Sequence, residues 1–367
     1  MNLILLIINV LKEVKARKNY KMGLTKEELL DATGEGVTVN YDPIEDRETY
    51  NYTYDPVGEL GDFLSEKIHS SINYGRYWHG YLILFRPLLL IFNILQIRKL
   101  LFFTYLLLFI YFTYLVKKRF GKDIAVILAL SLIFSGYFSA SYSLESSSIF
   151  LTMMISSIIL LLRIDKIKNF SLYLFGVACI TNFVDYLTVP LITLGMLSGL
   201  YLLKLMRDGK SWKYCLKFVI FNSIIWLLGY ASTWFVKWLL YDITINDGES
   251  MIKVGLTQSL YRMRRVNETV SNGSYIIYTI IDIISKSSLY TIISLSLLLI
   301  VNKFNFSSKK FNRNALSFLF LALLPIVWYF ALANHTVMHY YFTYRQSLLF
   351  IIGILLSFYE ILFKKEN

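Results

Sequence analysis

The chain carries few charged residues for its length. Of its 367 residues, 17% are Asp, Glu, Lys or Arg, whereas a soluble domain carries roughly 25%. It also has only two cysteines, Cys179 and Cys215, and both lie within or beside apolar runs. Their number and placement indicate neither a disulfide framework nor a zinc site.

Loops that bind nucleotide phosphates are missing as well. No segment matches GxxxxGK[ST] or GxGxxG, the glycine patterns whose backbone cradles a phosphate. The GxSxG turn that presents a nucleophilic serine is also absent. The sequence therefore argues against an intracellular nucleotide-binding enzyme.

Long apolar runs are what the chain has instead, and 56% of its residues are hydrophobic. A run of about 17–20 apolar residues is long enough to cross a bilayer core as a helix. The pattern predicts an all-α fold: a polytopic helical membrane protein with about nine to eleven transmembrane helices. Beyond residue 100 the runs cover 100–116, 124–140, 146–162, 170–184, 187–206, 216–238, 276–301, 315–333 and 346–362.

Lysine and arginine alternate between the short loops that join these runs. The loops near 117–122, 163–168, 207–213 and 303–313 and the segment after 362 are basic, whereas 141–147 and 181–187 contain no basic residue. Basic loops favour the cytoplasm. We therefore predict a multi-pass protein of the cell membrane with a cytoplasmic C-terminus, and the net charge of +12 gives no reason to expect nucleic acid as a partner.

The N-terminal region, 1–99, has a different pattern. Residues 1–11 are apolar but too short for a span, and 20–80 are polar and rich in acids. The segment RYWHGYLILFRPLLLIFNILQIRK, 76–99, is interrupted by Arg86 and Pro87. We predict an outer loop followed by an interfacial helix at 81–95. Two alternatives stay open: a true span at 81–97 with 12–80 inside, and an incomplete chain.

The second region, 100–367, is the predicted helical bundle, with an outer loop at 239–275. Ionisable groups at the ends of spans are energetically expensive and are often functional. Some have structural explanations: Glu145 suits a helix N-terminus, and Asp185 suits a tight turn. The candidate substrate-binding residues on the predicted outer face are His79, Arg86, Glu145, Asp185, Arg262, Arg265, His335, His339, Tyr344 and Arg345.

The stretch ANHTVMHYYFTYRQ, 333–346, concentrates several of these groups. His335 and His339 are four residues apart and would share one face of a helix. Such a pair suits a divalent metal, with Glu145 or Asp185 as a further ligand. An aromatic belt at the membrane surface is the competing explanation. We expect Arg345 and His339 to face a cleft shared with one of the two acids.

The arginines of the 239–275 loop allow two interpretations. Arg262 and Arg265 lie in YRMRRV. They suit the headgroups of anionic lipids, and their forked guanidinium groups equally suit a phosphate or pyrophosphate.

The layout resembles the C-class (GT-C) glycosyltransferases, integral membrane enzymes that use polyprenyl-phosphate sugars. An acidic outer loop, the segment RYWHGYLILFRPLL and paired spans with polar outer ends carry this resemblance. It implies that acids of the first outer loop are catalytic: Asp55 in NYTYDPVGEL, with Glu48 as second choice. It also implies a polyprenyl-phosphate sugar as donor, a cell-envelope glycan or lipid as acceptor, and arginines or a divalent metal at the departing phosphate, with Tyr344 bonded to the lipid phosphate.

Other functions are compatible with the same sequence. A transporter or flippase of lipid-linked glycans would need outer-face arginines and polar groups near the bilayer midplane. Asp282 and Lys286 are the main charged residues inside a run. A polysaccharide polymerase, an acyltransferase and an inactive membrane protein are further alternatives.

Overall fold

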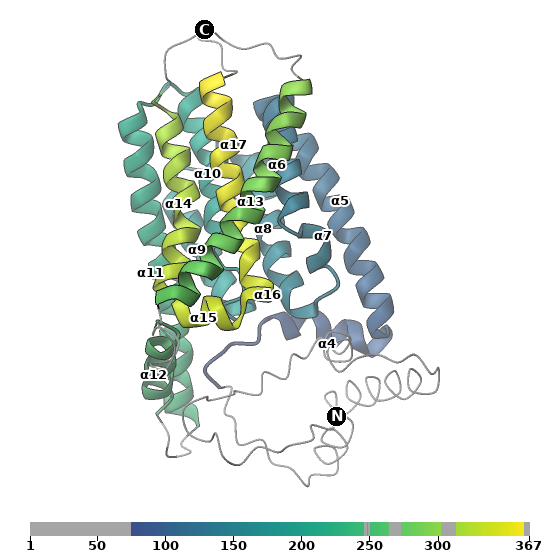
Figure 1. Ribbon diagram of the computed structural model, residues 1–367. Coiled ribbons are helices and arrows are strands. Elements are labelled where there is room, and N and C mark those ends of the chain that lie inside the picture. The colour runs from purple at the N-terminus through teal and green to yellow at the C-terminus, as the bar shows by residue number, and fades with distance from the viewer. Residues whose placement is uncertain (1–74, 246–247, 249, 264–272, 302–312, 363–367) are drawn as a thin grey trace. The chain divides into compact units, whose positions relative to one another are not determined.

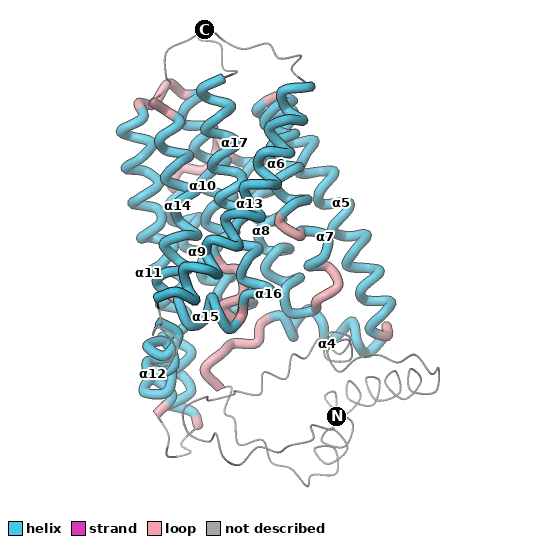
Figure 2. The backbone as a smooth tube through the Cα atoms, in the orientation of Figure 1, coloured by secondary structure: helices cyan, strands magenta, loops and turns pink. Residues whose placement is uncertain are grey.

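The structure, a computed structural model, describes residues 75–245, 248, 250–263, 273–301 and 313–362. Every regular element in these ranges is a helix (Figure 2). The predicted all-α class is therefore confirmed for this part of the chain. In chain order the helices are α4 (Tyr81–Ile91), α5 (Ile94–Phe120), α6 (Lys122–Phe134), α7 (Tyr137–Ala140), α8 (Leu144–Arg163), α9 (Phe170–Val184), α10 (Leu191–Arg207), α11 (Trp212–Thr244), α12 (Met251–Met263), α13 (Gly273–Val301), α14 (Ala315–Ala331), α15 (Ala333–Met338), α16 (Tyr340–Thr343), the 3-10 helix η1 (Tyr344–Ser347) and α17 (Leu348–Leu362).

Several of these helices are suited to a membrane. Five helical segments are long and apolar enough to cross one: Ile94–Phe120, Ser146–Arg163, Trp212–Thr244, Ile276–Ile300 and Tyr340–Leu362. Three shorter apolar helices accompany them: Tyr81–Ile91, Phe170–Val184 and Ala315–Ala331. Each predicted apolar run is largely helical, with three differences. The run 124–140 is broken at Gly136, whose φ is 79°. The helix predicted at 187–206 begins only at Leu191, and the run 315–333 is interrupted at Leu332. A multi-pass membrane protein is supported, while the number of spans stays a prediction.

The described residues belong to two compact units. The first contains Leu82–Leu100, which is most of α4 and the start of α5. Here the carbonyl of the Asn93 side chain accepts the Gln96 N–H, and the Gln96 side chain accepts the Asn93 N–H, both at 2.9 Å. This reciprocal capping box starts α5 at Ile94. The predicted helix at 81–95 thus ends at Ile91, and no single helix covers 81–97.

The second unit contains Gly75–Tyr81 and the chain from Leu101 onward. Its centre is α10, which is buried along nearly its whole length. A helix that is apolar on all sides must be covered by lipid or by other helices, and here α8, α9, α11, α14 and α17 all contact α10. Glycines allow close approach between these helices. A Cβ added to Gly195 of α10 would lie 2.1 Å from the side chain of Leu349.

The contact between α14 and α17 gives a test of this packing. A Cβ on Gly353 would lie 2.6 Å from the carbonyl oxygen of Phe318 and 2.7 Å from the Cβ of Ala322. Because one of these neighbours is backbone, Gly353→Ala should destabilise the protein by about 2 kcal/mol. Gly176→Ala is the matched control, since nothing lies within 4 Å of a Cβ there, and alanine favours a helix. Denaturation in detergent, followed by tryptophan fluorescence, measures both; equal stabilities would contradict the packing.

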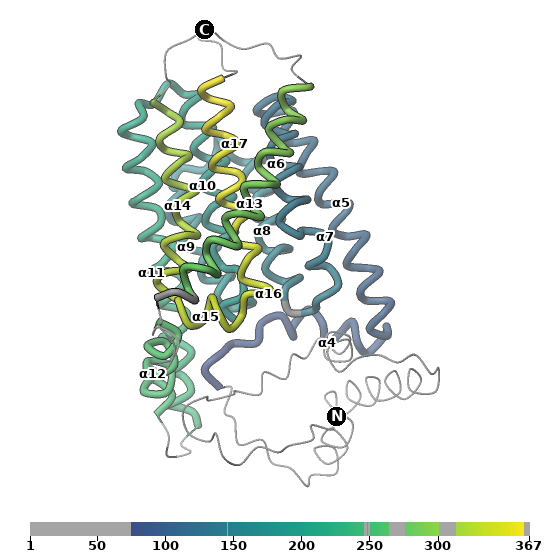
Figure 3. Tube along the Cα trace, in the orientation of Figure 1, coloured from purple at the N-terminus to yellow at the C-terminus, as the bar shows by residue number. Residues whose placement is uncertain are grey.

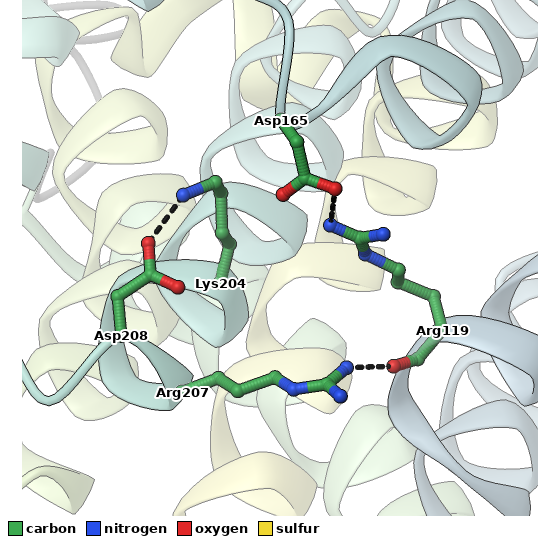
Figure 4. A network of polar contacts seen from close by, with 5 residues as sticks. All are labelled: Arg119, Asp165, Lys204, Arg207 and Asp208. Carbon is green, nitrogen blue, oxygen red and sulfur yellow. Dashed lines mark hydrogen bonds and ion pairs between the residues drawn. The ribbon is translucent and has the colours of Figure 1, made fainter.

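Three of the basic loops meet at one end of this unit (Figure 4). Arg119 at the end of α5 forms an ion pair with Asp165, which follows α8. Arg207 at the end of α10 donates to the carbonyl oxygen of Arg119 at 2.7 Å, and Lys204 pairs with Asp208. Exposed pairs of this kind stabilise a protein little. They do bring together three loops that the charge pattern assigned to one side.

The stretch 333–346 lies at the other end of this unit (Figure 3). There α14 is followed by the short helices α15 and α16 and by η1, and α17 then runs back along α14 (Figure 1). His339 interrupts the two short helices with φ −114° and ψ 32°. The predicted turn between two apolar helices is therefore present, and its direction changes at a histidine.

Candidate functional site

The turn from Asp185 to Thr188, between α9 and α10, is the centre of the candidate site. One carboxylate oxygen of Asp185 accepts the backbone N–H of Thr188 at 3.1 Å and also the Thr188 hydroxyl. The other oxygen accepts the hydroxyl of Tyr230 on α11 at 3.4 Å. Asp185 is only 5% exposed. The carboxylate thus has the turn-forming role that its sequence context allowed.

Burial changes the acidity of this carboxyl group. It raises the pKa of Asp185 from 3.8 to about 6, against the opposing effect of bonds from Thr188, Leu187 and Tyr230. Desolvation disfavours the charged form, and the hydrogen bonds recover part of that loss. Within the described ranges Asp185 has no Lys or Arg partner in an ion pair.

Two strained backbone positions flank the turn. Leu187 has φ 70° and His79 has φ 54°, and they are the only non-glycine residues with positive φ among those described. Side chains other than glycine adopt this conformation at a cost, and such strain concentrates at functional sites. At Leu187 it is accompanied by a contact: the Leu187 carbonyl oxygen lies 2.8 Å from Nε2 of His335.

The segment Gly75–Tyr81 is held on α9 and α11. The N–H of Gly80 donates to the carbonyl oxygen of Phe183 at 2.9 Å. The indole of Trp78 donates to the carbonyl oxygen of Thr233 at 2.9 Å. A Cβ on Gly80 would lie 2.3 Å from the Phe183 oxygen. Only glycine therefore fits between the aromatic segment and the end of α9.

Tyr186 joins this segment to the turn. Its hydroxyl lies 2.7 Å from that of Tyr81 and also contacts Nδ1 of His79. Its ring meets the ring of Tyr77 edge to face, with 5.1 Å between centroids. The structure thus places the predicted residue His79 beside the Asp185 turn.

Arg262, at the end of α12, reaches the same cluster. Its guanidinium donates to the hydroxyl of Tyr77 at 2.5 Å and to the carbonyl oxygen of Gln258 at 3.3 Å. Both acceptors are neutral, and no carboxylate of the described residues pairs with Arg262. A partly buried guanidinium without a counter-ion attracts an anion.

His335 in α15 and His339, the residue that follows this helix, lie side by side as predicted. The ring centroids of His335 and His339 are 4.7 Å apart. Burial lowers the pKa of His335 well below its ordinary value, with further lowering from His339 and Arg262. Burial and Arg262 lower the pKa of His339 to about 4. Both imidazoles are therefore neutral at physiological pH.

The divalent metal that the sequence allowed gains no ligand set here. No group of three or more His, Cys, Asp or Glu that could hold a metal occurs among the residues described. The charge of Arg262 also opposes a cation at the histidine pair. Glu145 lies in the first turn of α8. The N-cap of this helix is Ser143, whose hydroxyl oxygen accepts the N–H of Ser146 at 3.2 Å.

Arg345 and Tyr344 contact a different element. The guanidinium of Arg345 lies 3.5 Å from the hydroxyl of Ser139 on α7 and 5.2 Å from the centroid of the Tyr344 ring. A Cβ on Gly136 would lie 3.2 Å from the hydroxyl oxygen of Tyr344. The structure thus places Arg345 against α7, while Arg262 reaches Tyr77.

The remaining candidates divide into two groups. Arg86 is exposed on α4 and belongs to the first unit. Asp55, Glu48 and Arg265 lie outside the described residues. The two acids that the resemblance assigned to catalysis are among these three.

Sequence reasoning missed Tyr186, Leu187 and Tyr77. Tyr186 is next to Asp185 in the stretch NFVDYLTVP, so its proximity to that carboxylate was available from the sequence. The left-handed backbone of Leu187 was not, because leucine seldom adopts it.

Comparison with protein-family models, curated proteins and solved structures finds no match to this chain.

Proposed function

We propose that this protein is a membrane glycosyltransferase that moves a sugar from a polyprenyl-phosphate donor to a cell-envelope glycan or lipid at the outer membrane face. One observation supports this most: Arg262, which pairs with no carboxylate of the described residues, lies in a cluster with Tyr77 and two neutral histidines at one end of a helical unit. In this cluster the guanidinium of Arg262 can bind an anion, and the neutral histidines and Tyr77 can bind hydroxyl groups.

Physical chemistry connects such a cluster to the proposed reaction. A polyprenyl chain stays in the bilayer, so its sugar phosphate must be bound where the helices end. Transfer leaves negative charge on the departing phosphate, which a preorganised guanidinium stabilises. The acceptor hydroxyl needs a general base, and the resemblance to the C-class enzymes assigns this role to Asp55 or Glu48.

A transporter of lipid-linked glycans is the second candidate, because one candidate span contains charges. In α13 the ammonium group of Lys286 lies 2.7 Å from a carboxylate oxygen of Asp282 and 2.8 Å from the hydroxyl of Tyr340. Charges inside a span often mark a transport path. These charges neutralise each other within one turn of a helix, which favours the enzyme.

Reconstituted liposomes provide the test. The purified protein is incorporated with a radiolabelled polyprenyl-phosphate hexose and an acceptor extract from cell envelopes, and covalent transfer to the acceptor is measured. Asp55→Asn or Glu48→Gln should abolish transfer, while Asp208→Asn, at the basic end of the unit, should retain it. Movement of the labelled donor between leaflets without covalent transfer would replace the proposal by the transporter.

The proposed orientation predicts which positions face outside. In a variant lacking Cys179 and Cys215, a cysteine at Tyr142, which is 56% exposed, should react with an impermeant thiol reagent on intact cells. A cysteine at the exposed position Lys210 should react only after permeabilisation, because basic loops face the cytoplasm. The reverse pattern would move the candidate site to the inner face.

A further inference from the structure

Hydrogen bonding fixes the tautomer of His335. Its Nε2 lies 2.8 Å from the carbonyl oxygen of Leu187, and a carbonyl oxygen can only accept. Nε2 therefore carries the hydrogen, and a neutral imidazole has only one. Nδ1 of His335 is left with a lone pair and no hydrogen, so it can only accept a hydrogen bond.

Among the described residues that nitrogen has no hydrogen-bond partner. His335 is 4% exposed, and its Nδ1 is buried without a hydrogen bond in the part of the chain that the structure describes. Nδ1 of His339 is also buried without a hydrogen bond among the described residues. The His339 ring is stacked on Phe342, with 5.2 Å between centroids. A buried polar atom without a partner is energetically costly. These two differ from the other such atoms of the described residues in lying on adjacent rings close to the charge of Arg262, an arrangement suited to a ligand that supplies hydrogen bonds.

The surroundings select the chemistry of that ligand. A metal ion would lie near the positive charge of Arg262 and would find no third ligand among the described His, Cys, Asp and Glu side chains. A bare phosphate oxygen would meet a lone pair at His335. A hydroxyl group fits, because it donates to an acceptor and can itself accept. Arg262 remains for an anionic group on the same molecule.

We propose that His335 and His339 form a hydroxyl-binding subsite that holds the sugar of a sugar phosphate whose phosphate contacts Arg262. Naming the ligand as a polyprenyl-phosphate sugar rests on the proposed function; the hydroxyl chemistry rests on the histidines. The edge-to-face rings of Tyr77 and Tyr186 lie in the same cluster and supply aromatic surface for a sugar ring.

The test compares ligands with and without the sugar. Protein in lipid nanodiscs is labelled with ¹⁵N at histidine, of which the chain has four. Binding and the ¹⁵N spectrum are measured with a short-chain polyprenyl-phosphate hexose, with the same polyprenyl phosphate lacking sugar, and with Zn²⁺. The sugar-bearing probe should shift the Nδ1 signal of His335, and the sugar-free probe should leave it unchanged.

Matched variants assign the contact. His335→Gln keeps a donor for the Leu187 carbonyl and removes the Nδ1 acceptor. It should weaken binding of the hexose probe about tenfold, as expected for a lost hydrogen bond, and leave the sugar-free probe within about twofold. Lys253→Gln, at an exposed position of α12, should change neither affinity. Equal weakening of both probes, stoichiometric Zn²⁺ binding that needs both histidines, or no binding of the hexose probe would each overturn the subsite.

The two proposals can fail separately. If the hexose probe binds with the expected dependence on His335 but no sugar is transferred in liposomes, the subsite stands and the glycosyltransferase fails. If transfer occurs and His335→Gln leaves both the affinity and the KM for the donor unchanged, the enzyme stands and the subsite fails.

Discussion

Replacing Arg262 by glutamine should lower sugar transfer about 100-fold, the usual effect of removing one preorganised group that stabilises transition-state charge. Arg262 is suited to this role because its bonds go to a tyrosine hydroxyl and a carbonyl oxygen, and no carboxylate of the described residues pairs with it. Arg262→Lys keeps the charge but loses the fork, and its activity should lie between those of wild type and Arg262→Gln. Initial rates in liposomes at saturating donor measure the effect.

Two controls separate phosphate binding from structure. Tyr77→Phe removes the hydroxyl to which the Arg262 guanidinium donates at 2.5 Å. If Arg262 needs this bond to be positioned correctly, Tyr77→Phe should lower sugar transfer as Arg262→Gln does. Arg345→Gln changes a guanidinium that contacts Ser139 on α7 and should reduce transfer far less. If Arg345→Gln abolishes transfer while Arg262→Gln retains it, the phosphate is held beside α7.

The long apolar runs predicted the long helices but not all their ends, and they did not predict α12 (Met251–Met263), which lies in the segment 239–275 that we expected to be a loop. The start of α5 at Ile94 depends on the reciprocal bonds of Asn93 and Gln96, a capping pattern readable in the sequence that the apolar run alone did not reveal. The break at Gly136 separates α6 from α7 inside one apolar run. The apolar run alone did not reveal this break, because Tyr137–Ala140 continues the run beyond Gly136.

The candidate site was predictable in part. The charge alternation assigned Asp185 and His335 to the same end of the bundle, and the structure joins them through the turn, since His335 bonds to the Leu187 carbonyl. We expected Arg345 to accompany them, but its guanidinium contacts Ser139 on α7, and Arg262 is the arginine that reaches Tyr77. The charge rule could not distinguish the two arginines, because it placed both on the outer face. The contacts of individual side chains with Tyr77 and Ser139 distinguish them.

The role of Asp185 also needed the structure. From the sequence its carboxylate suited a ligand site, a metal site or a turn. Its bonds to Thr188 and Tyr230 identify a positioning residue that fixes the turn bearing Tyr186 and Leu187. An asparagine retains an oxygen for the Thr188 N–H, so Asp185→Asn should retain sugar transfer, whereas loss of transfer would indicate that the carboxylate is itself catalytic.

Asp185→Asn should also change how stability depends on pH, and this is the largest stability effect expected. Burial raises the pKa of Asp185 from 3.8 to about 6 in the folded protein. Between these values the folded state holds a proton that the unfolded state has released, so the free energy of unfolding falls as pH rises. A difference of about 2 in pKa corresponds to about 3 kcal/mol. The Asn variant lacks this loss. Between pH 4 and pH 7 its free energy of unfolding should therefore rise by about that much relative to that of wild type.

Asp165→Asn gives a control of opposite sign. The bond from Arg119 lowers the pKa of this exposed carboxyl group, so Asp165 stabilises the fold above its unfolded pKa and loses that contribution on acidification. Because solvent screens the pair, the effect should be small.

Unfolding by denaturant in micelles at several pH values measures each variant against wild type. The histidines with lowered pKa values are present in every protein compared, so their titration cancels in the differences. A difference between Asp185→Asn and wild type that stays constant from pH 4 to pH 7 would show that the carboxyl group is not desolvated, and the packing of the 185–188 turn against α11 would then be wrong.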